Sequence, residues 1–370
     1  MKKSLIAPVV VGAFALAVGG CATPPAASSS GAPPTAAASS SAPMSDYKAC
    51  MVSDAGGFDD KSFNETAYAG LTKAKTELGV QTAEVQSKAD ADYPKNVQAM
   101  VDANCDAIVT VGFKLGDATL AAAKKYPDIK FAIVDYAYSD PKTGKNTAPA
   151  NLKGLVFATS EPSFMAGYLA ASLSRTGKVG TFGGATIPSV TAFMDGYARG
   201  VGHYNQAKSK NVAVLGWDTA KKDGTFIGGK DPFNDLAGGK KVASNLMAQG
   251  ADVLLPVAGP SGEGALQVAK SSKGKVSSLW VDIDGCISQE QYCAVIPTSV
   301  GKSMDVAVFE AIKAAKEDTF SNELYVGTLA NGGAYLAPFH DFDAKVTDET
   351  RAELEKIKAD IIAGTIKTTA

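Results

Sequence analysis

The feature that most limits the fold of this chain is a repeated alternation of apolar runs with helical patterns. The runs are continuously apolar, as in parallel strands that are covered on both faces. In the first block we expect strands at 48–53, 81–86, 106–111, 130–134 and 155–158, and helices at 63–78, 93–104 and 115–125. In the second we expect helices at 163–174, 189–206, 235–249, 262–272, 302–317 and 347–363, and strands at 178–182, 211–216, 252–257, 276–282, 325–328 and 334–338. Two blocks of βα units predict an α/β fold with two doubly wound parallel sheets, and 370 residues can bury two such cores.

A glycine-containing turn links the first expected strand to the first helix. The glycine pair 56–57 can adopt backbone angles that other residues avoid, so the chain can turn sharply there. Ser62 and Glu65 have the spacing of a capping box, in which Ser62 accepts the Glu65 N–H and the glutamate reaches back. This would place Asp54 and Phe63 at the crevice where open α/β sheets bind ligands. An ordinary strand–turn–helix corner is the alternative interpretation.

The N-terminal residues predict export and a lipid anchor. Residues 1–20 read as a signal peptide, with two lysines followed by a short apolar segment. Small residues then precede Cys21, as in a lipobox whose acylated cysteine becomes the first mature residue; a secretory signal with an incidental cysteine is the alternative. Residues 21–45 are uncharged and consist mainly of Ala, Ser, Pro, Gly and Thr, so we expect a disordered tether. The predicted location is the extracytoplasmic face of the cell membrane.

Four further cysteines favour disulfides, because their number is even and the chain is predicted to be exported. Cys286 and Cys293 are close in sequence within one loop. Cys50 and Cys105 lie at or beside the starts of two strands that should be neighbours in a sheet. We predict the pairs Cys50–Cys105 and Cys286–Cys293; four buried free thiols are the alternative.

Three aspartates follow expected strands and are the main candidates for ligand contacts. Asp54, Asp135 and Asp282 each end an apolar run, where a turn-forming role would also explain an aspartate. Three carboxylates at strand tips would line one crevice and accept hydrogen bonds from sugar hydroxyls and base N–H groups. A neutral ligand rich in hydrogen-bond donors is therefore indicated. The net charge of −2 does not suggest a polyanionic partner such as nucleic acid.

Aromatic and glycine-rich segments supply the remaining candidates. Phe63 and Phe233 could stack on both faces of a planar base, although an aromatic residue near a helix start more often packs in the core. The loop 259–264 lacks the Gly-Lys-Ser/Thr ending of a phosphate loop, so it indicates either close approach to a neutral ligand or a tight turn. Lys302 is the one basic residue that we place in the crevice; a solvated lysine is the alternative.

Residues 54–64, Asp-Ala-Gly-Gly-Phe-Asp-Asp-Lys-Ser-Phe-Asn, closely resemble the signature of the basic membrane protein family, the nucleoside-binding lipoproteins of bacterial ABC transporters. The resemblance extends from about Lys48 to the C-terminal helix, with weaker motifs at 257–264, 281–282 and 298–302. It implies a type I periplasmic-binding-protein fold, in which two lobes are joined by a multi-strand hinge. The expected lobes are 46–160 plus 297–320 and 161–296 plus 321–370.

The resemblance also implies roles for particular residues. Base contacts are expected from Asp54 and Phe63, stacking from Phe233, a loop contact from Gly262, and contacts near the ribose from Asp282 and Lys302. Asn64 and Asp135 are further expected ligand contacts. Residues 217–230 look like an insertion, within which Phe226 competes for the stacking role, and Pro260-Ser261 departs from the family loop. These departures leave the base preference open.

The sequence therefore predicts a monomeric receptor that binds a nucleoside, with a purine preferred, and delivers it to an ABC permease. A receptor for a sugar or another small polar ligand, or an adhesin or signalling receptor on the same fold, are the alternatives. A hydrolase using the pair Asp59-Asp60 lacks a nucleophile elbow, a histidine partner or a metal-ligand cluster. His203 and His340 lie in separate contexts. We expect no enzyme activity, cofactor or metal.

Overall fold

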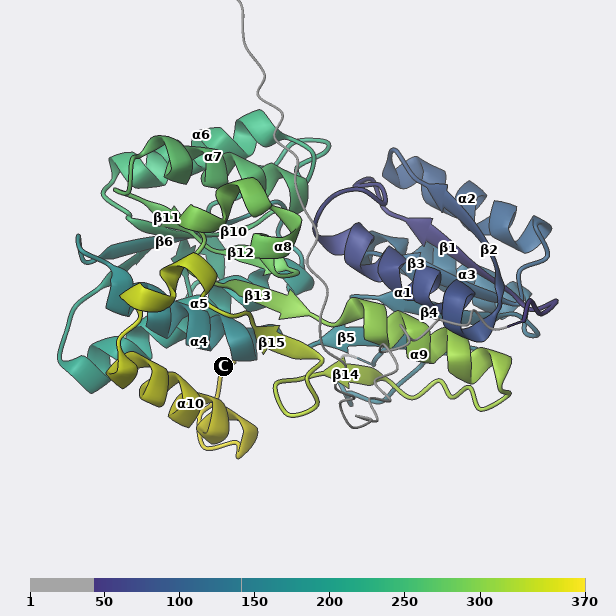
Figure 1. Ribbon diagram of the computed structural model, residues 1–370. Helices are drawn as coiled ribbons and strands as arrows, with labels where there is room; N and C mark the ends of the chain where they lie inside the picture. Colours follow the sequence, from purple (N-terminus) through teal and green to yellow (C-terminus); the bar gives the residue numbers. More distant parts are fainter. Residues whose placement is uncertain (1–42, 141, 370) are drawn as a thin grey trace, which may run out of the picture. The chain divides into compact units, whose positions relative to one another are not determined.

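The computed structural model describes residues 43–140 and 142–369 (Figure 1). The predicted signal peptide, the acylation site Cys21 and most of the predicted tether lie outside the described residues. The folded part reaches back into the expected tether, because the Ser45 N–H donates to the Gly79 carbonyl at 2.8 Å. Among the described residues, no helix has both the length and the apolar character that crossing a membrane requires.

The first lobe is built on a six-stranded sheet in which every pairing is parallel. Its strands, in order across the sheet, are β14 (Tyr325–Gly327), β5 (Leu152–Phe157), β4 (Lys130–Val134), β3 (Ala107–Val111), β1 (Lys48–Ser53) and β2 (Gln81–Gln86). One face packs against α1 (Phe63–Leu78) and α9 (Met304–Lys316), and the other against α2 (Tyr93–Asp102) and α3 (Gly116–Lys125). Successive residues of β1 enter the two cores alternately, as a strand covered on both faces requires.

The second lobe contains a parallel four-stranded sheet. Its strand order is β11 (Ser277–Ser278), β10 (Val253–Val257), β6 (Lys178–Gly183) and β7 (Ala213–Leu215). Helices α4 (Ser160–Leu173) and α5 (Pro188–Lys208) share one core with this sheet, and α6 (Leu236–Ala248) and α7 (Glu263–Ser271) share another. The predicted α/β class with doubly wound parallel sheets is confirmed.

Smaller elements complete the second lobe. Strand β12 (Trp280–Asp282) pairs in parallel with β13 (Ser299–Lys302), which pairs antiparallel with β15 (Ala334–Leu336). The remaining elements are the β8 (Trp217–Asp218) and β9 (Asp223–Gly224) hairpin, α8 (Gly285–Ser288) and α10 (Asp348–Ile362), which packs on α4. The expected strand 276–282 is thus two strands, since its first residues pair with β10 and its last with β13.

The chain passes between the lobes three times, after β5, after β13 and after β14. Backbone hydrogen bonds tie these crossings together, from Ala158 N–H to Gly327 O at 2.7 Å and from Ser303 N–H to Gly333 O at 2.9 Å. The predicted lobe boundaries need correction at two strands. Strand β14 belongs to the first sheet because it pairs with β5, and β13 lies in the second lobe because it pairs with β12. The other boundaries remain predictions.

Both predicted cysteine pairs are bonded in the structure. Cys50 on β1 is joined to Cys105, which precedes the neighbouring strand β3, with 6.0 Å between the Cα atoms. Cys286 is joined to Cys293 across a separation of seven residues, with 4.6 Å between the Cα atoms.

Helices α4 and α5 cross at a contact that requires glycine. A Cβ atom on Gly167, Gly196 or Gly200 would overlap a backbone carbonyl oxygen of the other helix. The absence of side chains at these points lets the two backbones touch. The crossing matters for the site because α5 carries Phe193 into the interlobe cavity described below.

We expect Gly200→Ala to lower the free energy of unfolding by about 1–3 kcal/mol, because the added methyl group forces the crossing helices apart. Gly202→Ala on the same helix is the matched control, since a Cβ there meets no atom within 4 Å. Alanine should stabilise that half-buried helical position, which has room for the methyl group, by about 0.5–1 kcal/mol. Urea denaturation of both variants checks the contrast, and equal effects would contradict the close crossing.

Candidate functional site

A cavity of ≈ 370 Å³ lies between the lobes, at the carboxyl ends of their strands. The first lobe contributes the β1–α1 turn and the end of β4. The second lobe contributes α5, the segments 230–233 and 257–260, and the end of β12. This volume lies within the usual range of small-molecule sites.

Seven of the eight predicted ligand contacts line this cavity: Asp54, Phe63, Asn64, Asp135, Phe233, Asp282 and Lys302. Gly262 is the exception. It is buried one turn further along, where a Cβ atom would meet Pro256 and Trp280. Gly259 and Pro260 form that part of the wall instead.

The predicted capping box at the start of α1 is wrong. Ser62 makes no side-chain cap, and Glu65 accepts a hydrogen bond from the Lys61 N–H at 2.9 Å. Asp60 caps the helix instead, accepting the N–H groups of Ser62, Asn64 and Glu65 at 2.9–3.1 Å. A carboxylate satisfies several orphan N–H groups at once and favours the positive end of the helix dipole, so Asp60 displaces the serine.

Asn64 joins this cap to the predicted base-binding residue Asp54. Its side-chain amide donates to Asp54 Oδ1 at 2.8 Å and to Asp60 Oδ2 at 3.0 Å. Because both partners are acceptors, the NH₂ group must face them, and the amide oxygen must point the other way. That oxygen is buried and has no partner among the described residues. Burial raises the pKa of Asp54 to about 6 despite hydrogen bonds from Asn64 and the Gly56 N–H.

Lys302, at the end of β13, is buried in the site and only 2% exposed. Its ammonium nitrogen lies 2.8 Å from Asp135 Oδ2 of the first lobe and 3.0 Å from Asp282 Oδ1 of the second. The same nitrogen lies 4.5 Å from the centroid of the Phe63 ring. The lysine therefore bridges the two lobes through one carboxylate from each.

The electrostatics of this triad favour a charged lysine. Burial alone would lower the Lys302 pKa, but the charges of Asp135 and Asp282 outweigh it and the net shift is upward. Burial raises the pKa of Asp135, and Lys302 opposes that rise. Both aspartates have left-handed backbones, with φ of 64° and 72°, a conformation that aspartate adopts more readily than most residues.

The aromatic residues come from both lobes. Phe63 lines one side of the cavity and Phe233 the other, where the Phe233 carbonyl accepts the Ser261 N–H at 3.0 Å and so joins its loop to residues 259–262. Phe226, the competing candidate, packs edge-on against Trp217 with 6.3 Å between ring centroids and is not in the lining. Phe193 of α5 also lines the cavity. Sequence reasoning missed it because it looks like an ordinary core residue of an amphipathic helix.

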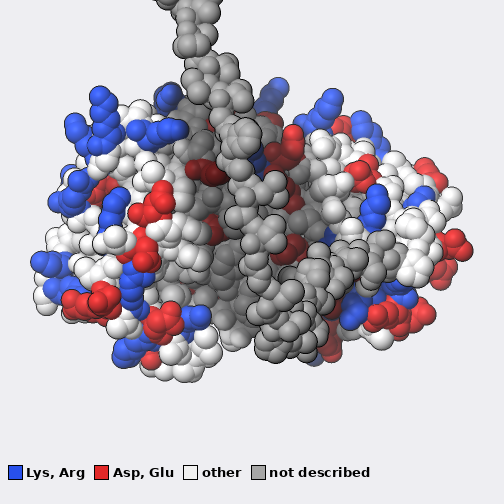
Figure 2. All heavy atoms as spheres, viewed as in Figure 1, with Lys and Arg blue, Asp and Glu red and all other residues white. Residues whose placement is uncertain are grey.

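Sequence reasoning also missed the charged rim of the cavity. Lys114 pairs with Asp90 at 3.0 Å, and the Tyr93 hydroxyl donates to the same aspartate at 3.1 Å. Across the opening, the Asn234 amide donates to the Ala55 carbonyl at 2.7 Å and links the second lobe to the β1–α1 turn. Over the outer face drawn in Figure 2, acidic and basic side chains are interspersed, in keeping with the small net charge.

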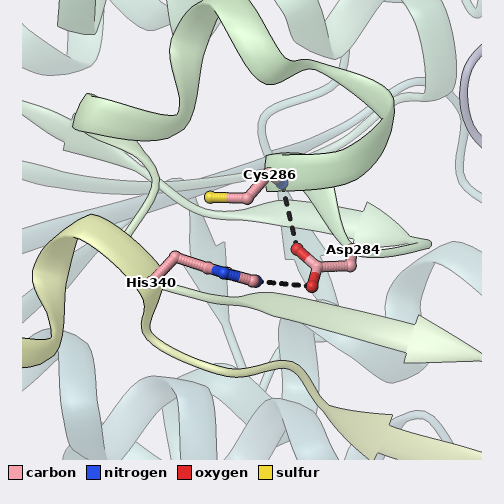
Figure 3. Close-up of side chains that lie close together, drawn as sticks. All are labelled: Asp284, Cys286 and His340. Atoms are coloured by element: carbon pink, nitrogen blue, oxygen red, sulfur yellow. Dashed lines mark hydrogen bonds and ion pairs between the residues drawn. The ribbon is translucent and has the colours of Figure 1, made fainter. Parts of the chain in front are cut away.

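One cluster outside the cavity resembles a metal site, with Asp284, Cys286 and His340 close together (Figure 3). Cys286 is bonded to Cys293 and therefore has no thiolate to offer. Asp284 and His340 instead bond to each other at 2.6 Å, tying the end of β12 to the segment after β15. Two remaining donors fall short of the three or four ligands that protein metal sites use.

The arrangement is that of a receptor cleft between two hinged α/β lobes, the architecture of substrate-binding proteins of ABC transporters. Residues 47–367 match the family model described as "Bmp: ABC transporter substrate-binding protein PnrA-like". The chain belongs to this family and has the predicted type I periplasmic-binding-protein fold, which places it among binding proteins rather than enzymes. As such a protein it binds a small-molecule ligand and works with a transporter permease.

Individual relatives agree with this placement. Basic membrane protein A1 of Borrelia garinii subsp. bavariensis is 32% identical over 287 residues, 77% of each chain. The ABC transporter nucleoside-binding protein BmpA of Lactococcus lactis subsp. cremoris is 31% identical, over 87% of this chain and 89% of its own. An ABC transporter solute-binding protein from Aeropyrum pernix K1 has a similar structure, with a TM-score of 0.75 and 27% identity, over 87% of this chain and 92% of that one.

Removing the lysine of the buried triad tests its electrostatics. We expect Lys302→Met to lower the free energy of unfolding at pH 7 by about 3–5 kcal/mol, because two buried carboxylates lose their cation. The loss should shrink as the pH falls toward 5. Without Lys302 the folded-state pKa of Asp135 rises further above its unfolded value, so the folded variant gains a proton first.

The double variant Lys302→Met/Asp135→Asn is the control. It removes one of the two carboxylates that have lost their cation, so it should recover part of the lost free energy of unfolding. Urea denaturation at pH 7 and pH 5 measures both effects. A loss that is independent of pH and unchanged in the double variant would contradict the assigned ion triad.

Proposed function

We propose that this protein is an extracytoplasmic lipoprotein that binds a nucleoside, with a purine base preferred, in the cavity between its lobes. The observation that carries the proposal is Asp54 Oδ2, which has no partner among the described residues, in a cavity that also has an aromatic ring on each lobe. Such a cavity suits a flat group that has hydrogen-bond donors on its edge.

The base would occupy the end formed by Asp54, Asn64, Phe63 and Phe233. Asp54 Oδ1 is used by Asn64 and the Gly56 N–H, and among the described residues Oδ2 has no partner. Asp54 Oδ2 would accept an N–H group from the base edge, and the Asn64 amide would hold the Asp54 carboxylate in place. Stacking of the two rings on the base faces would contribute about 1–3 kcal/mol per base.

The ribose would lie at the Lys302 end. Asp135 uses Oδ2 for Lys302, and within the described residues its Oδ1 is left for sugar hydroxyls. A hydrogen bond from a hydroxyl to an ionised carboxylate contributes about 1.5–3 kcal/mol. Because the ligand would contact both lobes, it would bind the closed arrangement more tightly than an open one and shift the population toward it.

The proposed location in the cell is based on the N-terminal residues. After cleavage of the signal peptide 1–20, acylated Cys21 would hold the protein, as a monomer, at the outer face of the membrane beside its permease. The nucleoside assignment is supported by the family and by the relative named as a nucleoside-binding protein.

Calorimetric titration tests the ligand class. We expect inosine, guanosine or adenosine to bind the purified protein, and free ribose to bind at least a hundredfold more weakly because it lacks the stacked base. Lysozyme in the same buffer controls for heats of dilution. Binding of ribose with no response to nucleosides would move the assignment to a sugar receptor, and release of free base would indicate a hydrolase.

The pKa of about 6 at Asp54 predicts opposite pH dependences for two groups of purines. Inosine and guanosine carry N1–H and need the carboxylate, so their affinity should fall about tenfold between pH 7.5 and pH 5. Adenosine presents an acceptor at N1 and needs the protonated carboxyl, so its affinity should rise over the same range.

Asp54→Asn is the control for this prediction, because an amide offers both a donor and an acceptor and does not titrate. Its inosine and adenosine affinities should vary little with pH. Parallel pH profiles for inosine and adenosine in the wild-type protein would contradict the placement of the base edge at Asp54.

A further inference from the structure

We propose that Ser62 is a positioning residue that holds the Asp282 carboxylate from the opposite lobe and so couples lobe closure to ligand binding. The Ser62 hydroxyl lies 2.7 Å from Asp282 Oδ2, and it must be the donor because the ionised carboxylate can only accept. Ser62 is fully buried and Asp282 is 6% exposed. The ligand-dependent part of this inference rests on the proposed function; the coupling between the lobes does not.

The Ser62 hydroxyl is available for this role because it makes no capping hydrogen bond to helix α1 of its own lobe. A serine just before a helix ordinarily caps it. Here Asp60 caps the helix instead, and the Ser62 backbone N–H is one of the groups that donate to its carboxylate. The β1–α1 turn thus places a buried hydroxyl within reach of Asp282, which lines the cavity from the other lobe.

Asp282 in turn depends on this hydroxyl for its orientation. Its two carboxylate oxygens have separate partners, with Oδ1 paired to Lys302 and Oδ2 bonded to Ser62. Lys302 lies on β13, which pairs with β12 in the same small sheet, so that contact moves with the second lobe. The Ser62 bond is the direct link from Asp282 to the first lobe.

Separation of the lobes would break the Ser62–Asp282 bond, and closure would form it. The bond therefore belongs to the closed arrangement, in the same way as the contacts of a ligand that touches both lobes. Two interactions that favour one conformational state support each other energetically. Ser62 would stabilise closure and at the same time hold a carboxylate in place for the ligand.

The test compares Ser62→Ala with the wild-type protein with and without ligand. Spin labels on exposed Lys75 of α1 and Lys240 of α6, both replaced by cysteine, report the interlobe distance. Without ligand, the alanine variant should shift toward longer distances. With inosine as the probe, Kd should rise about ten- to hundredfold, mainly through faster dissociation measured by stopped flow.

Two controls separate this role from simple damage. Ser172→Ala removes a hydroxyl that only bonds back to the Leu169 carbonyl in α4 and should change neither distance nor affinity. Asp60→Ala removes the cap of three N–H groups and should lower the melting temperature more than Ser62→Ala, which removes one hydrogen bond.

Unchanged interlobe distances in ligand-free Ser62→Ala would overturn the proposal, as would a melting temperature that falls as far as that of Asp60→Ala. Longer distances together with weaker inosine binding would support it. If inosine fails to bind even the wild-type protein, the proposed ligand is wrong. The ligand-free distances still decide the role of Ser62.

Discussion

The interaction on which the site depends is the burial of one ammonium group between two carboxylates from different lobes. Lys302 is the last residue of β13, and α9 of the first lobe begins two residues later at Met304. The charge therefore lies at a crossing between the lobes. A buried lysine is tolerated only with close anionic partners, so its position requires Asp135 and Asp282 to be held nearby. The position of the chain crossing at Lys302 and the positions of the two carboxylates that surround it therefore depend on each other.

The fold could be predicted largely from pattern because most strands of the two main sheets are short apolar runs and most are followed by a helix. The helix predicted at 63–78 has those bounds in the structure, since Gly79 ends it in a left-handed conformation. The exceptions are two late strands that lie in the other lobe from the one predicted. Tyr325–Gly327 pairs with β5, and Ser299–Lys302 pairs with β12. Local pattern carries no information on which sheet a late strand joins.

The site was predictable where chemistry follows directly from position at a strand tip, as for Asp54, Asp135 and Asp282. It was not predictable where two local solutions compete. Ser62 and Asp60 both have residue types that cap helices, and only the folded turn decides that the carboxylate does so. Phe193 gave no signal at all, because a phenylalanine on an amphipathic helix is ordinarily core. Its exposure to the cavity depends on how α5 crosses α4.

Two groups of carboxylates line the cavity and have different partners, and the difference bears on the proposed ligand selectivity. In one group, the Lys302 ammonium lies between the carboxylates of Asp135 and Asp282, which hold its positive charge in place. At Asp54, burial outweighs the hydrogen bonds from the Asn64 amide and the Gly56 N–H and raises the pKa of the carboxyl to about 6. In the proposed complex, the fixed charge at Lys302 would face the ribose hydroxyls, and the titratable Asp54 carboxyl could match either a donor or an acceptor on the base. Base preference would then depend on the surroundings of one carboxyl group rather than on the fold that positions it.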